Sequence, residues 1–210
     1  MRTVAVLPVK DFSRAKQRLR TGLEPETREE LAEAMLEDVL DALVIANKIE
    51  AILVVTDGPG ARRVADRRGL RVIEDREQGH NAAARRGIEA VLAAGGERAL
   101  LVPGDCPALD PAELDGLLER PVVSPSVLIV SDRHGTGTNA LLLTPPDALA
   151  PSFGPGSCAR HLEHARAAGV DAEVVHVPSL ALDIDTPDDL GALANLPDRA
   201  PRTQALLARC

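Results

Sequence analysis

The chain has 210 residues, 45% of them hydrophobic, and a formal net charge of −8. A chain of this length buries enough apolar surface to fold as a single α/β domain without disulfide bonds or structural zinc. The acidic balance argues against nonspecific binding to DNA or to anionic membranes, and the near absence of aromatic residues argues against stacking on single-stranded nucleic acid. We therefore expect neither a nucleic acid nor a membrane as a partner.

Cysteine usage and hydropathy indicate the compartment. The cysteines Cys106, Cys158 and Cys210 are odd in number and widely spaced, so they predict no disulfide framework. No apolar run approaches the roughly 20 residues that cross a bilayer, and the N-terminus begins with a strand-like run instead of a signal peptide. We predict a location in the reducing cytoplasm.

Apolar runs and helical periodicity alternate in the first half of the chain. The predicted elements, in order, are a strand at 3–7, a polar and basic loop at 9–23, a helix that begins with a capping box of Thr27 and Glu30, a strand at 51–56, a helix at 60–68, a short strand at 71–73, a helix at 81–94, a strand at 99–102, and a helix that opens at Asp110 and Pro111. This alternation predicts a mostly parallel sheet with helices on both faces.

The pattern changes in the second half. Apolar runs at 127–130 and 141–144 flank a Gly-rich polar loop, which predicts an antiparallel hairpin at one edge of the sheet. The remaining predicted elements are a helix that follows Ser157 and ends near Gly169, a strand at 173–177, and a last helix capped by Thr186. We expect one domain over residues 1–196 and a poorly patterned tail at 197–210.

Basic side chains follow the first predicted strand, at the edge where open α/β sheets bind their ligands. Lys10 and Lys16 are two of only three lysines in the chain, and Arg18 and Arg20 follow them. A loop this cationic suits a triphosphate, whose charge must be neutralised before a nucleophile can approach. A solvated surface loop is the alternative explanation of this segment taken alone.

Carboxylates supply a second candidate site. Asp105 closely follows a buried strand, and Asp183 and Asp185 alternate along a short predicted strand, so that one of them could face the site. Because Mg²⁺ prefers carboxylate and phosphate oxygens, Asp105 with Asp183 or Asp185 could converge on one ion. As a structural alternative, Asp105 could simply cap a turn. Asp183 and Asp185 could supply negative charge at a helix N-terminus, although Asp188 and Asp189 already supply that charge.

Two glycine-containing segments are candidate anion sites. The loop at 133–139 offers backbone N–H and hydroxyl groups, but a plain hairpin turn explains it by itself, and its partial dinucleotide fingerprint fails because a strand follows it. The segment at 153–157 precedes a helix whose free N–H groups attract anions, and its serine could equally be the N-cap. Zinc at Cys158, His161 and His164 is disfavoured, because the first and last lie on different helix faces.

Several short motifs occur together in a characteristic order. They are PVK at 8–10, AKQRL at 15–19, GHNAA at 79–83, GDCP at 104–107, TGTN at 136–139, FGPGS at 153–157 and DTPDDL at 185–190. As a set they resemble the phosphoenolpyruvate/2-phospho-L-lactate guanylyltransferases that build the deazaflavin coenzyme F-420, a branch of the sugar-nucleotidyltransferase-like folds. Two lysine-containing motifs replace the Gly-rich first loop of the wider class, and His80 stands where the family pattern has an apolar residue.

This resemblance implies a single-domain Rossmann-like nucleotidyltransferase fold and a set of site residues. It implies that Lys10, Lys16 and Asp105 take part in catalysis and that Lys10 and Lys16 bind the triphosphate. It implies that Asn81 contacts guanosine and that the phosphorylated acid is bound by Thr138, Gly154 and Ser157. It also implies that Mg²⁺ is bound by Asp105 with one or both of Asp183 and Asp185.

The implied reaction transfers GMP from GTP to phosphoenolpyruvate and releases pyrophosphate, with Mg²⁺ as cofactor. A phosphate monoester is largely dianionic near neutral pH, since its second pKa is ~6, and it needs no general base. The Arg-rich, Lys-poor composition is typical of a GC-rich bacterial genome, which favours phosphoenolpyruvate as the acceptor.

Other functions stay open at this point. The acceptor could be 2-phospho-L-lactate, 3-phosphoglycerate, a sugar phosphate or molybdopterin. A glycosyltransferase would release a nucleotide without making pyrophosphate, and a non-catalytic protein would bind GTP and release nothing. The expected partners are therefore GTP and a small phosphorylated acid. A homodimer is compatible with the sequence, which does not determine the oligomeric state.

Overall fold

The computed structural model describes residues 1–20, 22–75, 79–121, 123–196 and 198–209. Their strands are β1 (Thr3–Pro8), β2 (Ala51–Thr56), β3 (Arg71–Glu74), β4 (Arg98–Leu101), β5 (Ser126–Ser131), β6 (Thr138–Thr144) and β7 (Asp171–Val175). Their helices are α1 (Pro25–Ile45), α2 (Pro59–Arg67), α3 (His80–Ala93), α4 (Pro111–Glu119), α5 (Ser157–Ala168), α6 (Pro178–Ala181), α7 (Pro187–Ala194) and α8 (Pro201–Leu207). Two short 3-10 helices, η1 (Phe12–Arg14) and η2 (Gln17–Leu19), lie in the loop after β1.

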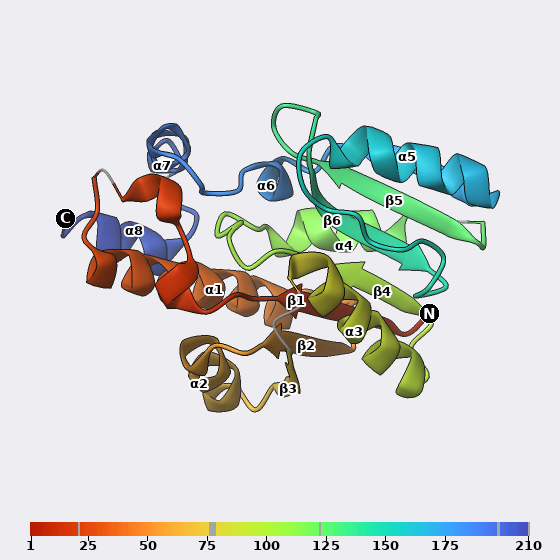
Figure 1. The fold of residues 1–210 in the computed structure, drawn as a ribbon, viewed down its shortest axis with the longest axis horizontal. Coiled ribbons are helices and arrows are strands. Elements are labelled where there is room, and N and C mark those ends of the chain that lie inside the picture. Colours follow the sequence, from red (N-terminus) through yellow and green to blue (C-terminus); the bar gives the residue numbers. More distant parts are fainter. Residues whose placement is uncertain (21, 76–78, 122, 197, 210) are drawn as a thin grey trace.

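The strands form one sheet in the order β3-β2-β1-β4-β6-β5-β7 (Figure 1). Strand β6 is antiparallel to both of its neighbours, β4 and β5, whereas the other pairs are parallel. The predicted hairpin is therefore confirmed, and so is the mostly parallel sheet. The parallel β7 follows at the far edge.

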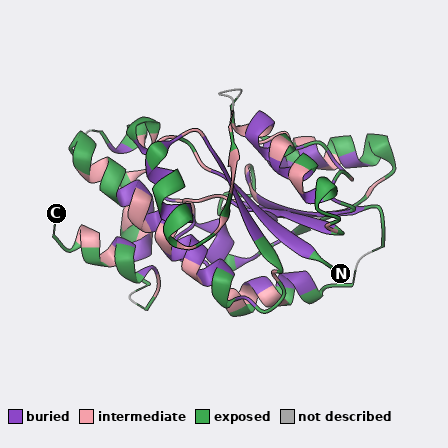
Figure 2. Cartoon of the chain, turned by 90° about the horizontal axis from the view of Figure 1, so that it is seen from below, coloured by how far each residue is buried: buried purple, intermediate pink, exposed green. Residues whose placement is uncertain are grey.

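The inner strands of the sheet, such as β1, β4 and β5, are buried on both faces (Figure 2). In β1, the side chains of Ala5 and Leu7 belong to the core under α1, α2 and α4, whereas Val4 and Val6 belong to the core under α3 and α5. Successive side chains of a strand point to opposite faces, so a strand covered on both sides must be apolar throughout. This explains the uninterrupted apolar runs from which the strands were predicted.

Two local predictions were wrong. Helix α1 begins at Pro25 with Glu24 as its N-cap, so Thr27 lies inside the helix and forms no capping box with Glu30. Proline suits the first helical position because its ring already has a helical φ. The segment 183–185 is a loop and not a strand, and the N–H of Ile184 donates to the carbonyl of Asp105 at 3.0 Å.

The C-terminal segment is more ordered than its pattern predicts. Helix α8 packs on α1, where the carboxylate of Asp38 accepts from the N–H of Arg202 at 3.1 Å and from the N–H and hydroxyl of Thr203 at 2.9 and 2.7 Å. A side chain of α1 thus satisfies the free N–H groups at the start of α8. No described helix is long and apolar enough to cross a bilayer.

Candidate active site

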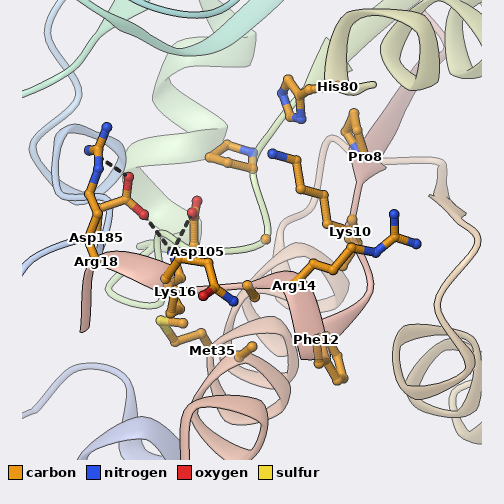
Figure 3. A pocket seen from close by; sticks show the side chains of 16 residues that line it. Pro8, Lys10, Phe12, Arg14, Lys16, Arg18, Met35, His80, Asp105 and Asp185 are labelled. Atoms are coloured by element: carbon orange, nitrogen blue, oxygen red, sulfur yellow. Dashed lines mark hydrogen bonds and ion pairs between the residues drawn. The ribbon is translucent and has the colours of Figure 1, made fainter. Parts of the chain in front are cut away.

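A cavity of about 390 Å³ opens at the carboxyl ends of the parallel strands (Figure 3). It is lined by the end of β1 and the loop after it, by Ala32 and Met35 of α1, by the start of α3, by the loop after β4, and by Asp185. The carboxyl ends of parallel strands meet at one edge of a sheet, which is why segments far apart in the sequence converge there.

Lys16 lies between two carboxylates at the centre of this cavity. Its Nζ is 2.7 Å from Asp105 Oδ2 and 3.1 Å from Asp185 Oδ1, and only 5% of its side chain is exposed. Burial lowers the pKa of Lys16, but the charges of Asp105 and Asp185 outweigh it and raise the pKa above its ordinary value. Burial opposes ionisation of Asp105, and the ammonium of Lys16 nevertheless holds the pKa of that carboxyl below its usual range. The pair is therefore ionised near neutral pH.

Asp183 is the third carboxylate of the group. Asn139 Nδ2 donates to Asp183 Oδ1 at 3.3 Å and to the carbonyl of Leu180 at 2.7 Å. Burial raises the pKa of Asp183, and the negative charge of Asp105 raises it further. The structure thus places Asp105 and Asp185 beside Lys16, and Asp183 close enough to Asp105 for that charge to affect its pKa. It shows no preformed cluster of metal-binding side chains among the described residues.

Lys10 and His80 lie on the opposite side of the cavity, and the side chain of Lys10 points toward His80 (Figure 3). Among the described residues, no hydrogen bond or ion pair is formed by the ammonium of Lys10, which is exposed. Burial lowers the pKa of His80, while the charge of Asp105 opposes that change. An unpaired cation at the mouth of the cavity is available to an anionic ligand.

The two arginines suggested by the sequence, Arg18 and Arg20, differ in their position relative to the cavity. Arg18 lines the cavity, and its Nη1 is 3.4 Å from Asp185 Oδ2. Arg20 is exposed and does not line it. Arg18 is therefore the better placed of the two to contact a phosphate.

Asn81 uses its amide to hold another segment of the chain. Its Oδ1 accepts from the N–H of Phe153 at 2.7 Å, and its Nδ2 donates to the carbonyl of Phe153 at 3.2 Å. Sequence reasoning missed this contact, because the two residues are 72 positions apart. The role of Asn81 beside guanosine stays a prediction.

Thr138, Gly154 and Ser157 belong to two segments joined by a backbone hydrogen bond, in which the N–H of Cys158 donates to the carbonyl of Thr136 at 3.2 Å. Gly154 has a φ of +121°, which side-chain-bearing residues rarely adopt. Ser157 is the first residue of α5, and the N-cap is Gly156 and not Ser157.

The hydroxyl of Ser157 is buried without a hydrogen-bond partner among the described residues. A buried polar group without a partner is costly, so a ligand oxygen at this position would be stabilised. None of Thr138, Gly154 and Ser157 lines the cavity around Lys16. Their role in binding the phosphorylated acid stays a prediction.

The sequence did not predict the contacts that His161 makes in this region. It suggested this histidine only as a possible zinc ligand. Its two ring nitrogens contact Thr138 Oγ1 at 3.0 Å and the N–H of Ser152 at 2.9 Å. The only available signal was its position one helical turn after Ser157. Both ring nitrogens of His161 are therefore engaged in contacts within the protein.

The fold and the cavity define the chain as an α/β protein of the nucleotidyltransferase type. A solved structure from Desulfovibrio desulfuricans G20, assigned as a nucleotide-diphospho-sugar transferase, has a TM-score of 0.76 at 16% identity and covers 100% of this chain and 95% of its own. A nucleotidyl transferase from Methanothermobacter thermautotrophicus has a TM-score of 0.65 at 23% identity and covers 93% and 97%. These likenesses show the fold.

Similarity in sequence identifies the family more specifically than similarity in fold. Residues 3–196 match the family model described as "Guanylyl transferase CofC like", and the chain belongs to that family. A phosphoenolpyruvate guanylyltransferase from Conexibacter woesei is 50% identical, over 93% of this chain and 89% of its own length. A 3-phospho-D-glycerate guanylyltransferase from Phenylobacterium zucineum is 39% identical over 92% and 90%. A 2-phospho-L-lactate guanylyltransferase from Methanothermobacter thermautotrophicus is 33% identical over 92% and 84%.

Proposed function

We propose that this chain transfers GMP from GTP to phosphoenolpyruvate and releases pyrophosphate, as a step in the formation of coenzyme F-420. The acceptor is chosen on the name of the 50% identical relative. The names of two more distant relatives keep 3-phospho-D-glycerate and 2-phospho-L-lactate as alternatives.

The observation that carries the proposal is the buried ammonium of Lys16 between Asp105 and Asp185. Lys10, Arg14 and Arg18 line the same cavity, so with Lys16 four cations surround the space in which a triphosphate would lie. Phosphoryl and nucleotidyl transfer depend mainly on positioning and on neutralisation of phosphate charge. This cavity supplies both, although the net charge of the whole chain is negative.

We also propose Mg²⁺ as cofactor, because the available donors are carboxylates, although among the described residues they are not already assembled around an ion site. Asp105 and Asp183 repel one another enough to contribute to the raised pKa of Asp183, and a divalent cation would relieve that repulsion. Asp105, with Asp183 or Asp185, would hold the ion, since Mg²⁺ takes one or two carboxylates together with phosphate oxygens. When bound, the ion would neutralise developing negative charge on the phosphates.

In the proposed reaction, a phosphate oxygen of the acid forms a bond to the α-phosphorus of GTP, and the bond from that phosphorus to pyrophosphate breaks. The attacking oxygen carries negative charge already, so no proton has to be removed. Lys10 and Lys16 neutralise the charge of the triphosphate and of the departing pyrophosphate. The cytoplasmic location and a homodimer stay predictions.

The test is pyrophosphate release from GTP with Mg²⁺, in which phosphoenolpyruvate, 2-phospho-L-lactate and 3-phospho-D-glycerate are supplied in separate reactions. We expect release with phosphoenolpyruvate and its loss, by about 100-fold or more, in Asp105→Asn, because transition-state charge stabilisation is worth several kcal/mol. Preference for another acid would correct the acceptor. Binding of GTP without release under any acid would contradict the proposal.

Two lysine variants sharpen this experiment. Lys10→Met removes the unpaired cation of the cavity and should raise KM for GTP by about tenfold. Lys48→Met is the matched control, since Lys48 pairs with Glu119 at 3.3 Å in a separate surface depression. An equal effect of both variants would indicate a general charge effect and not a contact at the site.

A further inference from the structure

His161 is fully buried in α5, between β6 and the segment before the helix. It has 0% relative exposure, and the ring of Phe153 contacts it edge-on with centroids 5.5 Å apart. The only hydrogen bonds of its ring among the described residues are those to Thr138 Oγ1 and to the N–H of Ser152. The proposed chemistry of the cavity does not use this histidine.

These two contacts determine which ring nitrogen carries the proton. The N–H of Ser152 can only donate, so Nε2 of His161 must accept with its lone pair. A neutral imidazole then has its proton on Nδ1. Nδ1 therefore donates to Thr138 Oγ1 at 3.0 Å, and the threonine oxygen is the acceptor.

The hydroxyl proton of Thr138 is consequently left for another group. Thr138 has no hydrogen bond to a side chain of the described residues except the one to His161. The hydroxyl of Ser157, one helical turn before His161 in α5, is also without a partner there. Two hydroxyl donors thus lie close to the start of α5, whose 12 residues give it a helix dipole that favours anions.

We propose that His161 is a positioning residue: it holds the Thr138 hydroxyl as a hydrogen-bond donor to an oxyanion of the phosphorylated acid. The inference rests on the proposed function, because it places the acid at Thr138. It goes further in naming the ring that orients the hydroxyl. A ligand group at this point must accept a hydrogen bond, so a carboxylate or phosphate oxygen fits and an ammonium or amide N–H does not.

The surroundings keep the imidazole neutral. Burial and, to a smaller extent, the charges of Arg160 and His164 on the same helix together lower the pKa of His161 to about 4. The groups that face the ring from the other elements, Thr138, Ser152 and Phe153, carry no charge. A proton on Nε2 would in addition remove the contact with Ser152. The donor role of Thr138 therefore persists across the neutral pH range.

The tautomer can be measured without any enzymatic activity. In the protein labelled with ¹⁵N-histidine, long-range ¹H–¹⁵N correlations should show the proton of His161 on Nδ1. The signals should not change between about pH 8 and pH 5.5, because the pKa lies well below that range. A proton on Nε2, or titration near pH 6.5, would overturn the proposal even if the guanylyltransfer reaction is confirmed.

Kinetics then test the effect on the acid. His161→Leu should raise KM for the acid by about tenfold and leave KM for GTP within about twofold, because only a hydrogen bond to a charged ligand is lost. Thr138→Val should do the same, and the double variant should be no worse than either single variant. His161→Asn, which retains an amide donor near Nδ1, should restore most of the affinity.

The outcomes separate this inference from the proposed function. Absence of pyrophosphate release in the wild-type enzyme with every acid refutes both. Release by the wild type, with equal changes in both KM values or with additive effects in the double variant, refutes only the positioning role. Thermal unfolding of each variant shows whether a loss reflects unfolding, in which case the unfolding temperature and the apparent kcat fall while both KM values stay unchanged.

Discussion

Lys16 shows at the scale of one residue how the site is held together. Its backbone has a φ of +52°, one of only two positive values at non-glycine residues in the described part of the chain. This conformation costs roughly 1–2 kcal/mol, and such strain is found most often at functional sites. Here it places a buried ammonium between Asp105 and Asp185.

The sequence predicts Lys16 as a site residue, but not its partners. Two of the three lysines follow the first strand, and that concentration of charge is visible without a structure. Asp105 and Asp185 are 89 and 169 residues away from Lys16. Their contact depends on strand order, which local patterns do not encode.

The buried His161 makes stability depend on pH. Its pKa is about 4 in the folded chain and ~6.5 in an unfolded one. As the pH falls between these values, the unfolded chain takes up a proton that the folded chain cannot, so the free energy of unfolding falls. From about pH 7.5 to pH 5, this single group should lower it by about 2 kcal/mol.

Urea unfolding of the wild type and of His161→Asn at these two pH values measures the effect. Every other group titrates in both proteins, so the stability advantage of the wild type should shrink by that amount at the lower pH. An identical pH dependence of the two proteins would show that the pKa of His161 is the same in the folded and unfolded chains.

At the scale of elements, α3 lies unusually close to the sheet because Gly87 faces it. A Cβ at Gly87 would lie 2.1 Å from Val6 Cγ1 and 3.3 Å from Val55 Cγ2. Both valines belong to central strands that have little freedom to move. Close packing of α3 positions His80, its first residue, at the cavity.

Gly87→Ala should therefore lower the free energy of unfolding by about 2 kcal/mol, because the added methyl group overpacks the core. Gly116 in α4 is the matched control: no atom lies within 4 Å of a Cβ built there. Gly116→Ala should raise stability by about 1 kcal/mol through helix propensity. Chemical denaturation measures both, and a stabilised Gly87→Ala would refute the close packing of α3.

The elements that sequence patterns missed are those whose stability comes from tertiary contacts. Helix α8 has only 7 residues, and a helix of that length is not stable in isolation. It forms because Asp38 of α1 satisfies its first N–H groups and Thr203 is buried. Longer elements such as the β5–β6 hairpin carry their own periodic signal and were predicted.

At the scale of the whole molecule, the proposed site unites the two ends of the sequence. The lysine loop follows β1, whereas Asp183 and Asp185 precede α7. The pairs that Lys16 makes with Asp105 and Asp185 already connect these regions. A ligand that binds there stabilises the folded chain as a unit, because it binds only when both regions are in place.

GTP with Mg²⁺, at about 100 times its dissociation constant, should raise the free energy of unfolding by about 2.7 kcal/mol. For a domain of this size that corresponds to a rise in Tm of roughly 5–10 °C. The proposed metal ligands are Asp105 and either Asp183 or Asp185. A chelator or the Asp105→Asn substitution should therefore remove most of this rise in Tm. Thermal scans measure it, and an equal rise with chelator present would refute the metal proposal.

The amino-acid sequence alone determined the alternation of strands and helices, the antiparallel hairpin and the polar segments of the cavity. Apolar periodicity is local, and parallel strands place their carboxyl ends at one edge, so these features need no distances. Only the tertiary structure decided that Lys16 pairs with Asp105 and Asp185, that Asn81 holds Phe153, and that His161 contacts Thr138. Each of these depends on distances of a few ångströms between distant segments, which strand order and packing set and a linear pattern cannot contain.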